Sequence, residues 1–242
     1  PYRATQFVDN EIYHVILRGV DDNLIFKNQD DYYRGVFSIY EFNSVKSITI
    51  REQRRSRQRI KNLLITNTNK DPIFVVDGRN KLVEIFSFVF MPNHLHLLLR
   101  QIKNRGITKF MSKVGTGYGG YFNRKYSRKG YVFQNRFLSV HIENEEQLKN
   151  VFVYIHTNPV SLVESNWKEK GIKYPEKAIK FLEDYKWSSH RDYIGRKNFP
   201  SVTGRDFIWR IMGGEKGCKE FVDYWIRYKG EIGELSKLFL ED

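Results

Sequence analysis

The sequence is almost without cysteine: Cys218 is the single one in 242 residues. One cysteine can form neither an intramolecular disulfide nor a cysteine-based zinc site, and its scarcity fits a reducing, cytoplasmic setting. The sequence also lacks any apolar run near the roughly 20 residues that a membrane-spanning helix needs, and its start has no apolar signal-peptide segment. We therefore expect a soluble intracellular protein with no membrane partner.

Acidic residues are few relative to basic ones, with 28 Asp and Glu against 41 Lys and Arg, so the formal net charge is +13. Such an excess attracts polyanions, which makes nucleic acid the leading partner, although a basic protein without that role fits the charge alone. Aromatic residues make up 15% of the chain, enough for an aromatic-rich core. The length suits one elaborated domain or a domain with an appendage.

The pattern of apolar residues predicts alternating strands and helices. We expect strands over 11–19 and 131–142, a hairpin over 81–100, and helices over 29–42, 106–126 and 143–158. The glycines of 114–120 predict a kink or a close backbone approach, and the chain after Pro159 is expected to be irregular. A hairpin among helices, without a glycine-rich phosphate loop, indicates an α+β fold.

Two basic segments stand out. Residues 51–62 contain six Arg or Lys against one Glu. This composition fits either a solvated insertion or a phosphate-binding segment. From Arg100 to Arg136 there are ten Lys or Arg, no acidic residue and seven interleaved Phe or Tyr. Some of these aromatics belong in the core, but the combination also supplies phosphate contacts and stacking platforms for a single strand.

His94 and His96 flank Leu95 on a predicted strand. Residues two apart on a strand point to the same face, so the two imidazoles would stand together while Leu95, Leu97 and Leu99 face the core. Such a pair can hold one divalent metal, although two histidines so spaced also occur as ordinary sheet residues.

Tyr154 and Asn158 are four residues apart on a helix that Asn144 can cap and Pro159 ends. This spacing puts the phenol and the amide oxygen on one helical face. A phenol, with a pKa of about 10, needs help to attack phosphorus. Mg²⁺ or Mn²⁺ bound by two imidazoles and an amide oxygen would polarise the phosphate. Alone, Tyr154 would be taken as a core tyrosine.

These features together resemble the single-tyrosine HUH transposases, and among them the repeat-associated (REP-associated) tyrosine transposases of bacteria. The matching segments keep the family's order and cover most of residues 1–195: YHVILRG at 13–19, FVFMPNHLHLLLR at 88–100, YFNRKYSRKGYVFQNRF at 121–137, YIHTNPV at 154–160 and YKWSSHRDYIG at 185–195. The histidine motif by itself is weak, whereas the ordered set is specific.

The resemblance implies an HUH endonuclease fold, in which a ferredoxin-like antiparallel sheet carries the histidines and a helix carries the nucleophile. It implies His94, His96 and Asn158 as metal ligands and Tyr154 as the catalytic nucleophile. Residues 1–195 would form this catalytic domain, with the segment 51–62 as an insertion, and residues 196–242 a mainly helical extension of unknown role.

Charge alone suggests Lys103, Lys125, Arg128 and Arg136 as DNA contacts, and the basic N-terminal segment of relatives adds Arg3. The resemblance leaves open whether active sites form within one chain or across a homodimer. It implies a cytoplasmic, nucleoid-associated bacterial protein.

The resulting hypothesis is DNA transposition chemistry: metal-dependent cleavage and rejoining of single-stranded DNA beside a hairpin, through a 5′-phosphotyrosine. Two alternatives stay open, a non-catalytic regulator that binds hairpin nucleic acid and a metal-dependent nuclease that uses water. The remaining histidines are expected to be structural or peripheral, and the rival nucleophiles are Tyr118, Tyr121, Tyr126 and Tyr131.

Overall fold

Four strands form one antiparallel sheet in the computed structural model, which describes residues 6–46, 77–134, 136–165, 167 and 171–228. They are β1 (Ile12–Arg18), β2 (Val83–Met91), β3 (His94–Gln101) and β4 (Leu138–Ile142), in the spatial order β2-β3-β1-β4. All neighbours are antiparallel. With helices after β1 and β3, this is a ferredoxin-like arrangement, and the predicted α+β sheet is confirmed.

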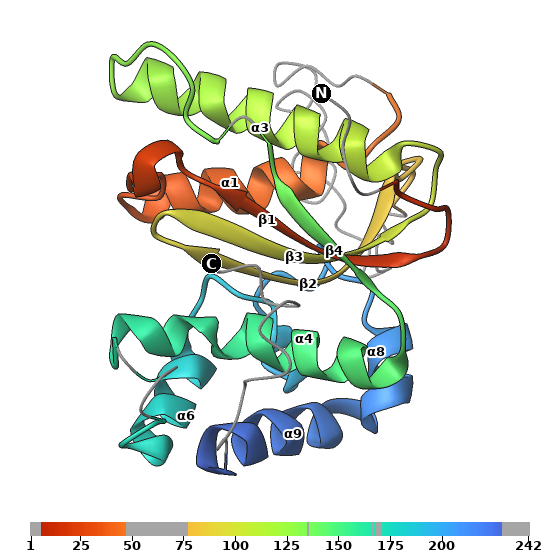
Figure 1. Cartoon of the computed structure of the whole chain (residues 1–242), viewed down its shortest axis with the longest axis vertical. Coiled ribbons are helices and arrows are strands. Elements are labelled where there is room, and N and C mark those ends of the chain that lie inside the picture. The colour runs from red at the N-terminus through yellow and green to blue at the C-terminus, as the bar shows by residue number, and fades with distance from the viewer. Residues whose placement is uncertain (1–5, 47–76, 135, 166, 168–170, 229–242) are drawn as a thin grey trace, which may run out of the picture.

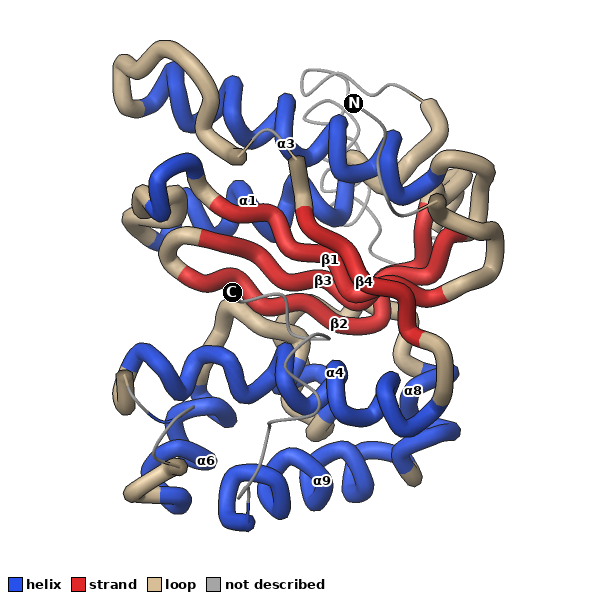
Figure 2. The backbone as a smooth tube through the Cα atoms, in the orientation of Figure 1, coloured by secondary structure: helices blue, strands red, loops and turns tan. Residues whose placement is uncertain are grey.

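Helices cover both faces of the sheet (Figures 1 and 2). On one face lie α1 (Gln29–Glu41) and α3 (Gly106–Lys125), and on the other lies α4 (Glu145–Thr157). Beyond α4 lie α6 (Pro175–Asp184), α8 (Asp206–Met212) and α9 (Gly214–Tyr228). No helix in these described ranges is both long and apolar enough to cross a bilayer.

The two-residue period of β3 divides the core into two parts. Leu95, Leu97 and Leu99 pack in the core under α1 and α3, whereas Leu98 packs in the core under α4. The histidines share the parity of Leu98 and therefore face α4. The predicted division of the hairpin into a leucine face and a histidine face is confirmed.

A β-bulge changes the parity of β2. The pairing of β2 with β3 shifts between Ile85 and Ser87. Before the bulge, Val83 and Ile85 point toward α1 and α3; after it, Phe88 and Phe90 do. A bulge adds one residue to one strand, so it moves every later side chain to the opposite face.

The structure corrects two expectations about secondary structure and decides a third. The α3 helix runs without interruption through the glycines of 114–120, and the Phe42 ring lies close to the backbone at Gly117, so the close approach is confirmed and the kink is not. The strand expected over 131–142 begins only at Leu138. The chain after Pro159 is not irregular: it forms the short 3-10 helix η2 (Asn158–Leu162), α6, α7 (His190–Tyr193), α8 and α9. Pro159 lies in the first turn of η2, a position that proline tolerates.

The C-terminal helices belong to the core that surrounds α4. Ile208 of α8 and Cys218, Val222 and Ile226 of α9 are buried with Phe152 of α4. The mainly helical character of this part is confirmed, whereas a domain boundary at residue 195 stays a prediction. The basic segment 51–62 lies outside the described residues.

The outer edge of β2 is covered by the segment 187–189. The amide of Ser189 donates to the carbonyl of Phe88 (3.0 Å), and the Ser189 hydroxyl accepts from the Phe88 amide (3.0 Å). The Phe90 amide donates to the carbonyl of Trp187. These bonds satisfy backbone groups that an edge strand otherwise leaves open.

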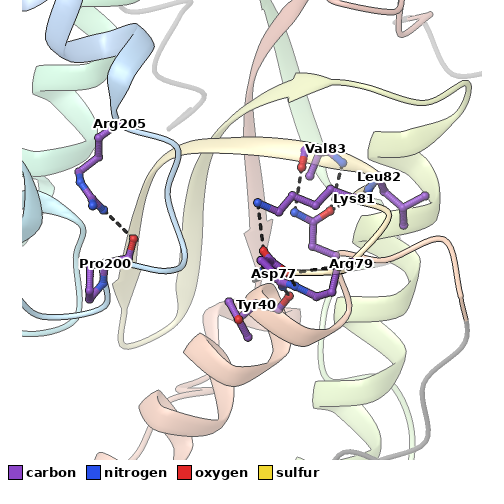
Figure 3. A network of polar contacts seen from close by, with 9 residues as sticks. Tyr40, Asp77, Arg79, Lys81, Leu82, Val83, Pro200 and Arg205 are labelled. Carbon is purple, nitrogen blue, oxygen red and sulfur yellow. Dashed lines mark hydrogen bonds and ion pairs between the residues drawn. The ribbon is translucent and has the colours of Figure 1, made fainter. Parts of the chain in front are cut away.

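Polar contacts fix the entry into β2 against the end of α1 (Figure 3). Asp77 pairs with Arg79 (2.6 Å) and Lys81 (3.1 Å), and the Arg79 guanidinium lies 3.6 Å from the ring centroid of Tyr40. Hydrogen bonds from Arg79 hold the pKa of Asp77 well below its usual range.

Asp31 joins the start of α1 to the end of α3. Its fully buried carboxylate accepts hydrogen bonds from Lys125 (2.7 Å), Tyr121 (3.0 Å) and Tyr126 (2.6 Å), and from the amide of Lys27 (3.0 Å). Burial would raise the pKa of Asp31, but these hydrogen bonds outweigh it and lower the pKa. The ionised form therefore stabilises the fold.

We predict that Asp31→Asn lowers the free energy of unfolding by roughly 2–4 kcal/mol at pH 7, because it removes the charge from a buried network. The folded-state pKa is depressed, so the contribution is complete above the unfolded pKa of about 4 and is lost as pH falls through the folded value. Urea unfolding at pH 7 and pH 3 should show the mutant deficit shrinking in acid. The exposed neighbour Asp30 provides the control, and Asp30→Asn should change stability by less than about 0.5 kcal/mol.

Candidate active site

The predicted ligands and nucleophile come together between β3 and α4. Asn158 follows the last turn of α4, and its Nδ2 lies 3.2 Å from Nε2 of His96. The rings of His96 and Tyr154 are 5.8 Å apart between centroids, and those of His94 and His96 are 4.7 Å apart. Four residues chosen from two sequence segments therefore form one cluster.

The local structure of α4 explains why Tyr154 and Asn158 face the sheet together. The Asn144 side chain accepts a hydrogen bond from the Gln147 amide (2.9 Å), which fixes the start of the helix as predicted. The Asn158 side chain also hydrogen-bonds the Tyr154 phenol. The four-residue spacing thus produces the contact that it predicted.

His14 was expected to be structural or peripheral, and it lies in the cluster as a partner of His96. Its Nε2 is 2.9 Å from Nδ1 of His96, and both side chains are fully buried. With the Asn158 amide donating to Nε2 of His96, the proton of that ring lies on Nδ1 and is donated to His14. One chain of hydrogen bonds therefore sets the tautomer of His96.

His94 has a matching arrangement. Its Nδ1 is 2.6 Å from Oδ1 of Asn93, an oxygen that can only accept, so the ring proton lies on Nδ1. Both predicted ligands thus present Nε2 as the lone-pair atom while Nδ1 donates to a second residue, which is typical of metal-binding histidines.

A divalent metal at this site would need the Asn158 amide as a third ligand besides the two imidazoles. In the described ranges, no three His, Cys, Asp or Glu side chains form a metal-binding group. Two imidazoles and the Asn158 amide are the available donors, and Oδ1 replaces Nδ2 when that amide turns over. Phosphate oxygens and water at the remaining positions would add the oxygen ligands that Mg²⁺ and Mn²⁺ prefer.

Tyr154 is fully buried, and Asn158 is 1% exposed. Burial raises the pKa of the Tyr154 phenol, while the hydrogen bond to Asn158 and the positive charge of Arg18 lower it without reversing the shift. The phenol is therefore protonated at neutral pH. Ionising it requires additional positive charge nearby.

Arg18 and His14 are the two cluster residues that sequence reasoning missed. Arg18 pairs in register with His94, and Ile16 pairs with His96, so the even-numbered residues of β1 share the face of the histidines. Both missed residues lie in the YHVILRG segment at 13–19. Its alternation of apolar and polar residues could have identified this face.

The predicted DNA contacts do not gather in one place. Lys103 follows the end of β3 that is farther from the two histidines. Lys125 is paired with Asp31, and the Arg128 guanidinium lies 5.6 Å from the Phe122 ring centroid. Arg136 is exposed beside a groove along α3. Arg3 lies outside the described residues.

The rival tyrosines lie away from the histidine cluster. Tyr118 donates to the carbonyl of Ile25, Tyr121 and Tyr126 donate to Asp31, and Tyr131 is 81% exposed on the α3 side. His156 faces the other side of α4, as predicted, with its Nε2 2.7 Å from the hydroxyl of Ser189. Tyr154 alone among the candidates lies beside His96.

Comparison with known proteins found one matching family model and similar solved structures. The family model described as "Transposase IS200 like" matches residues 53–158, a range that contains both motif histidines, Tyr154 and Asn158. No curated protein matches the chain. A solved structure titled "Structure of the REP associates tyrosine transposase bound to a REP hairpin" is similar at 15% identity and a TM-score of 0.43, covering 85% of this chain and 92% of that one.

The family match includes the hairpin with the two histidines, α3, β4 and all of α4, whereas β1, with His14 and Arg18, lies outside it. The family match over residues 53–158 agrees with the resemblance indicated by the sequence motifs.

Proposed function

We propose that this protein cleaves and rejoins single-stranded DNA next to a hairpin, with Tyr154 as the nucleophile. The observation that carries the proposal is the contact of the Tyr154 phenol with Asn158, which in turn contacts His96. A phenol, an amide and an oriented imidazole are thus available to one phosphate. The transposase family match supports the same chemistry.

In the proposed step, the phenol oxygen of Tyr154 attacks a phosphodiester, and the oxygen–phosphorus bond to the 3′ oxygen breaks. The phenol loses its proton, the 3′ oxygen gains one, and a 5′-phosphotyrosine forms. A 3′-OH can later attack this phosphorus and release the phenol, so rejoining needs no nucleotide cofactor.

His94, His96 and Asn158 would hold the metal in this proposal. When bound, Mg²⁺ or Mn²⁺ supplies positive charge that polarises the phosphate and stabilises the leaving oxygen. His14 and Asn93 would leave Nε2 of the two ligand rings unprotonated for the metal by accepting their Nδ1 protons. Arg18, whose charge lowers the pKa of Tyr154, is positioned to contact a phosphate oxygen.

The burial of the site favours a second candidate, a regulator that binds hairpin nucleic acid without cutting it. His96 and Tyr154 are fully buried, so a phosphate reaches the phenol only after neighbouring groups move. Partly buried His94 is the most accessible of the four residues. Cleavage assays separate the two functions.

We predict that the wild type, but not Tyr154→Phe, forms a covalent adduct with labelled single-stranded hairpin DNA in the presence of Mg²⁺ or Mn²⁺. The phenylalanine variant lacks the attacking oxygen, so adduct formation should fall below detection on a denaturing gel. Tyr118→Phe is the matched control, because Tyr118 is equally buried on the other face of the sheet, and it should retain the adduct.

Cleavage that persists in Tyr154→Phe without an adduct would identify a nuclease that uses water. Binding without cleavage by the wild type, on hairpins of varied sequence and with either metal, would identify the regulator.

We predict that Tyr154 does not ionise in the metal-free protein below pH 10, because burial raises its pKa above the ordinary value of about 10. The absorbance of phenolate at 295 nm, followed against pH, should coincide for the wild type and Tyr154→Phe up to that pH. An extra tyrosine titrating in the wild type near pH 8 would contradict the assigned environment.

We predict that His14→Leu weakens Mn²⁺ binding by roughly 10- to 100-fold, because it removes the residue that orients His96. His96→Ala should weaken binding further, since it removes a ligand. Isothermal titration calorimetry measures both affinities. His141→Leu is the control, because His141 lies on β4 with Glu11 as its partner (2.8 Å), and it should bind Mn²⁺ like the wild type.

A further inference from the structure

A groove of about 1000 Å³ runs along α3 on the face of the sheet opposite the histidine cluster. Its lining extends from Arg105 to Asn123 along the helix, which is about 27 Å at 1.5 Å per residue. The other wall is formed by residues 130–134, 136 and 137, between α3 and β4. The groove is therefore an elongated trough along the helix.

The floor of the groove contains helical glycines that packing does not explain. A Cβ at Gly106 would lie 2.3 Å from the carbonyl oxygen of Leu82, and one at Gly117 would lie 2.2 Å from Phe42, so tight packing accounts for these two. At Gly115 and Gly119, a Cβ would meet described atoms no closer than 4.0 Å and 3.8 Å. Glycine inside a helix is unfavourable, so its presence at these two positions needs a reason other than packing. Two glycines keep this part of the trough clear of side chains, which favours a ligand bound there.

The charge of the groove is of one sign. Arg105 and Arg136 contribute to its lining, which contains no acidic residue. Most of the lining comes from the stretch Arg100–Arg136, which has ten basic residues and no acidic one. This complementarity favours a polyanion and disfavours a basic peptide segment as the occupant.

Tyr131 provides an exposed ring at the groove. Its side chain is 81% exposed, although a tyrosine ring usually buries most of its surface. By contrast, Phe110, Tyr118, Phe122 and Phe133 of the same basic stretch are buried in the core. A solvent-facing ring beside a cationic trough is a platform on which a base can stack.

The groove wall adjoins the C-terminal end of β1, on whose other face the candidate active site lies. Gln134 in the groove wall donates from its amide to the carbonyl of Arg18 (2.9 Å), and Phe133 forms an isolated bridge with Gly19. The side chain of Leu17 lines the groove, while Arg18 belongs to the opposite face with His94. A strand that leaves the groove around the segment 133–134 therefore arrives beside Arg18.

We propose that this groove binds a single-stranded segment of DNA that continues into the site of Tyr154, with Arg105 and Arg136 contacting phosphates and Tyr131 stacking on a base. An exposed ring stacks on the face of an unpaired base, which a duplex keeps covered, so the occupant is a single strand. The link to strand cleavage rests on the function proposed above, whereas binding in the groove does not.

The test measures binding of a fluorescent single-stranded DNA oligomer by anisotropy, in the Tyr154→Phe background with EDTA, so that cleavage plays no part. Tyr131→Ala should raise Kd roughly 5- to 100-fold by removing one stacking contact. Arg105→Gln should raise Kd and reduce the slope of log K against log salt by about 0.7, the value for one phosphate contact on a single strand.

Gly119→Leu fills the groove without meeting backbone, so it should weaken binding at least 10-fold while leaving the thermal midpoint unchanged or higher. Tyr224→Ala and Arg210→Gln are matched controls, because both residues are exposed on the C-terminal helices, and they should bind as the background does.

Kd values within twofold of the background for all three groove variants would overturn the proposal, as would preference for RNA of the same sequence or for blunt duplex DNA. Groove-dependent binding without any Tyr154 adduct in the catalytically intact protein would uphold the groove and refute the proposed strand cleavage. A Tyr154 adduct together with groove-independent binding would refute the groove proposal and uphold the proposed strand cleavage.

Discussion

The burial of both faces of the sheet is the constraint on which the rest of the structure depends. Because helices cover each face, a polar side chain on β1 or β3 has to find its partners inside the protein. His96 does so through His14 and Asn158, and this need links β1, β3 and the end of α4. The same contacts that satisfy buried nitrogens also fix the proton on His96 and aim its lone pair. Fold stability and site geometry therefore share one set of hydrogen bonds.

The second helical layer extends this dependence to the C-terminal part of the chain. Both sides of α4 are covered, one by the sheet and the other by α6 and α9. Trp167 and Trp225 meet edge to face at 5.5 Å between ring centroids in this outer core. A helix held between two packed surfaces keeps Tyr154 and Asn158 in one orientation, which a helix lying on the sheet alone would do less firmly.

Local patterns predicted much of the fold and part of the site. The alternation in β3, the Asn144 cap and the spacing of Tyr154 and Asn158 depend on neighbours in sequence, and the structure agrees with each. The position of His14 depends on the register between β1 and β3, which no single strand encodes. The bulge after Ile85 is hidden because β2 is apolar on both faces. The helices after Pro159 form by packing against α4, and tertiary contacts of that kind override weak local signals.

The cover on the edge of β2 has a consequence for synthesis on the ribosome. Phe88 and its partner Ser189 are separated by 101 residues. At about 5–20 residues per second, β2 leaves the ribosome roughly 5–20 seconds before its cover. During that interval a strand with the sequence VEIFSFVFM has an open hydrogen-bonding edge and apolar side chains on both faces. The nascent chain is therefore prone to aggregation during that interval, and a chaperone that binds extended apolar segments would act on it then.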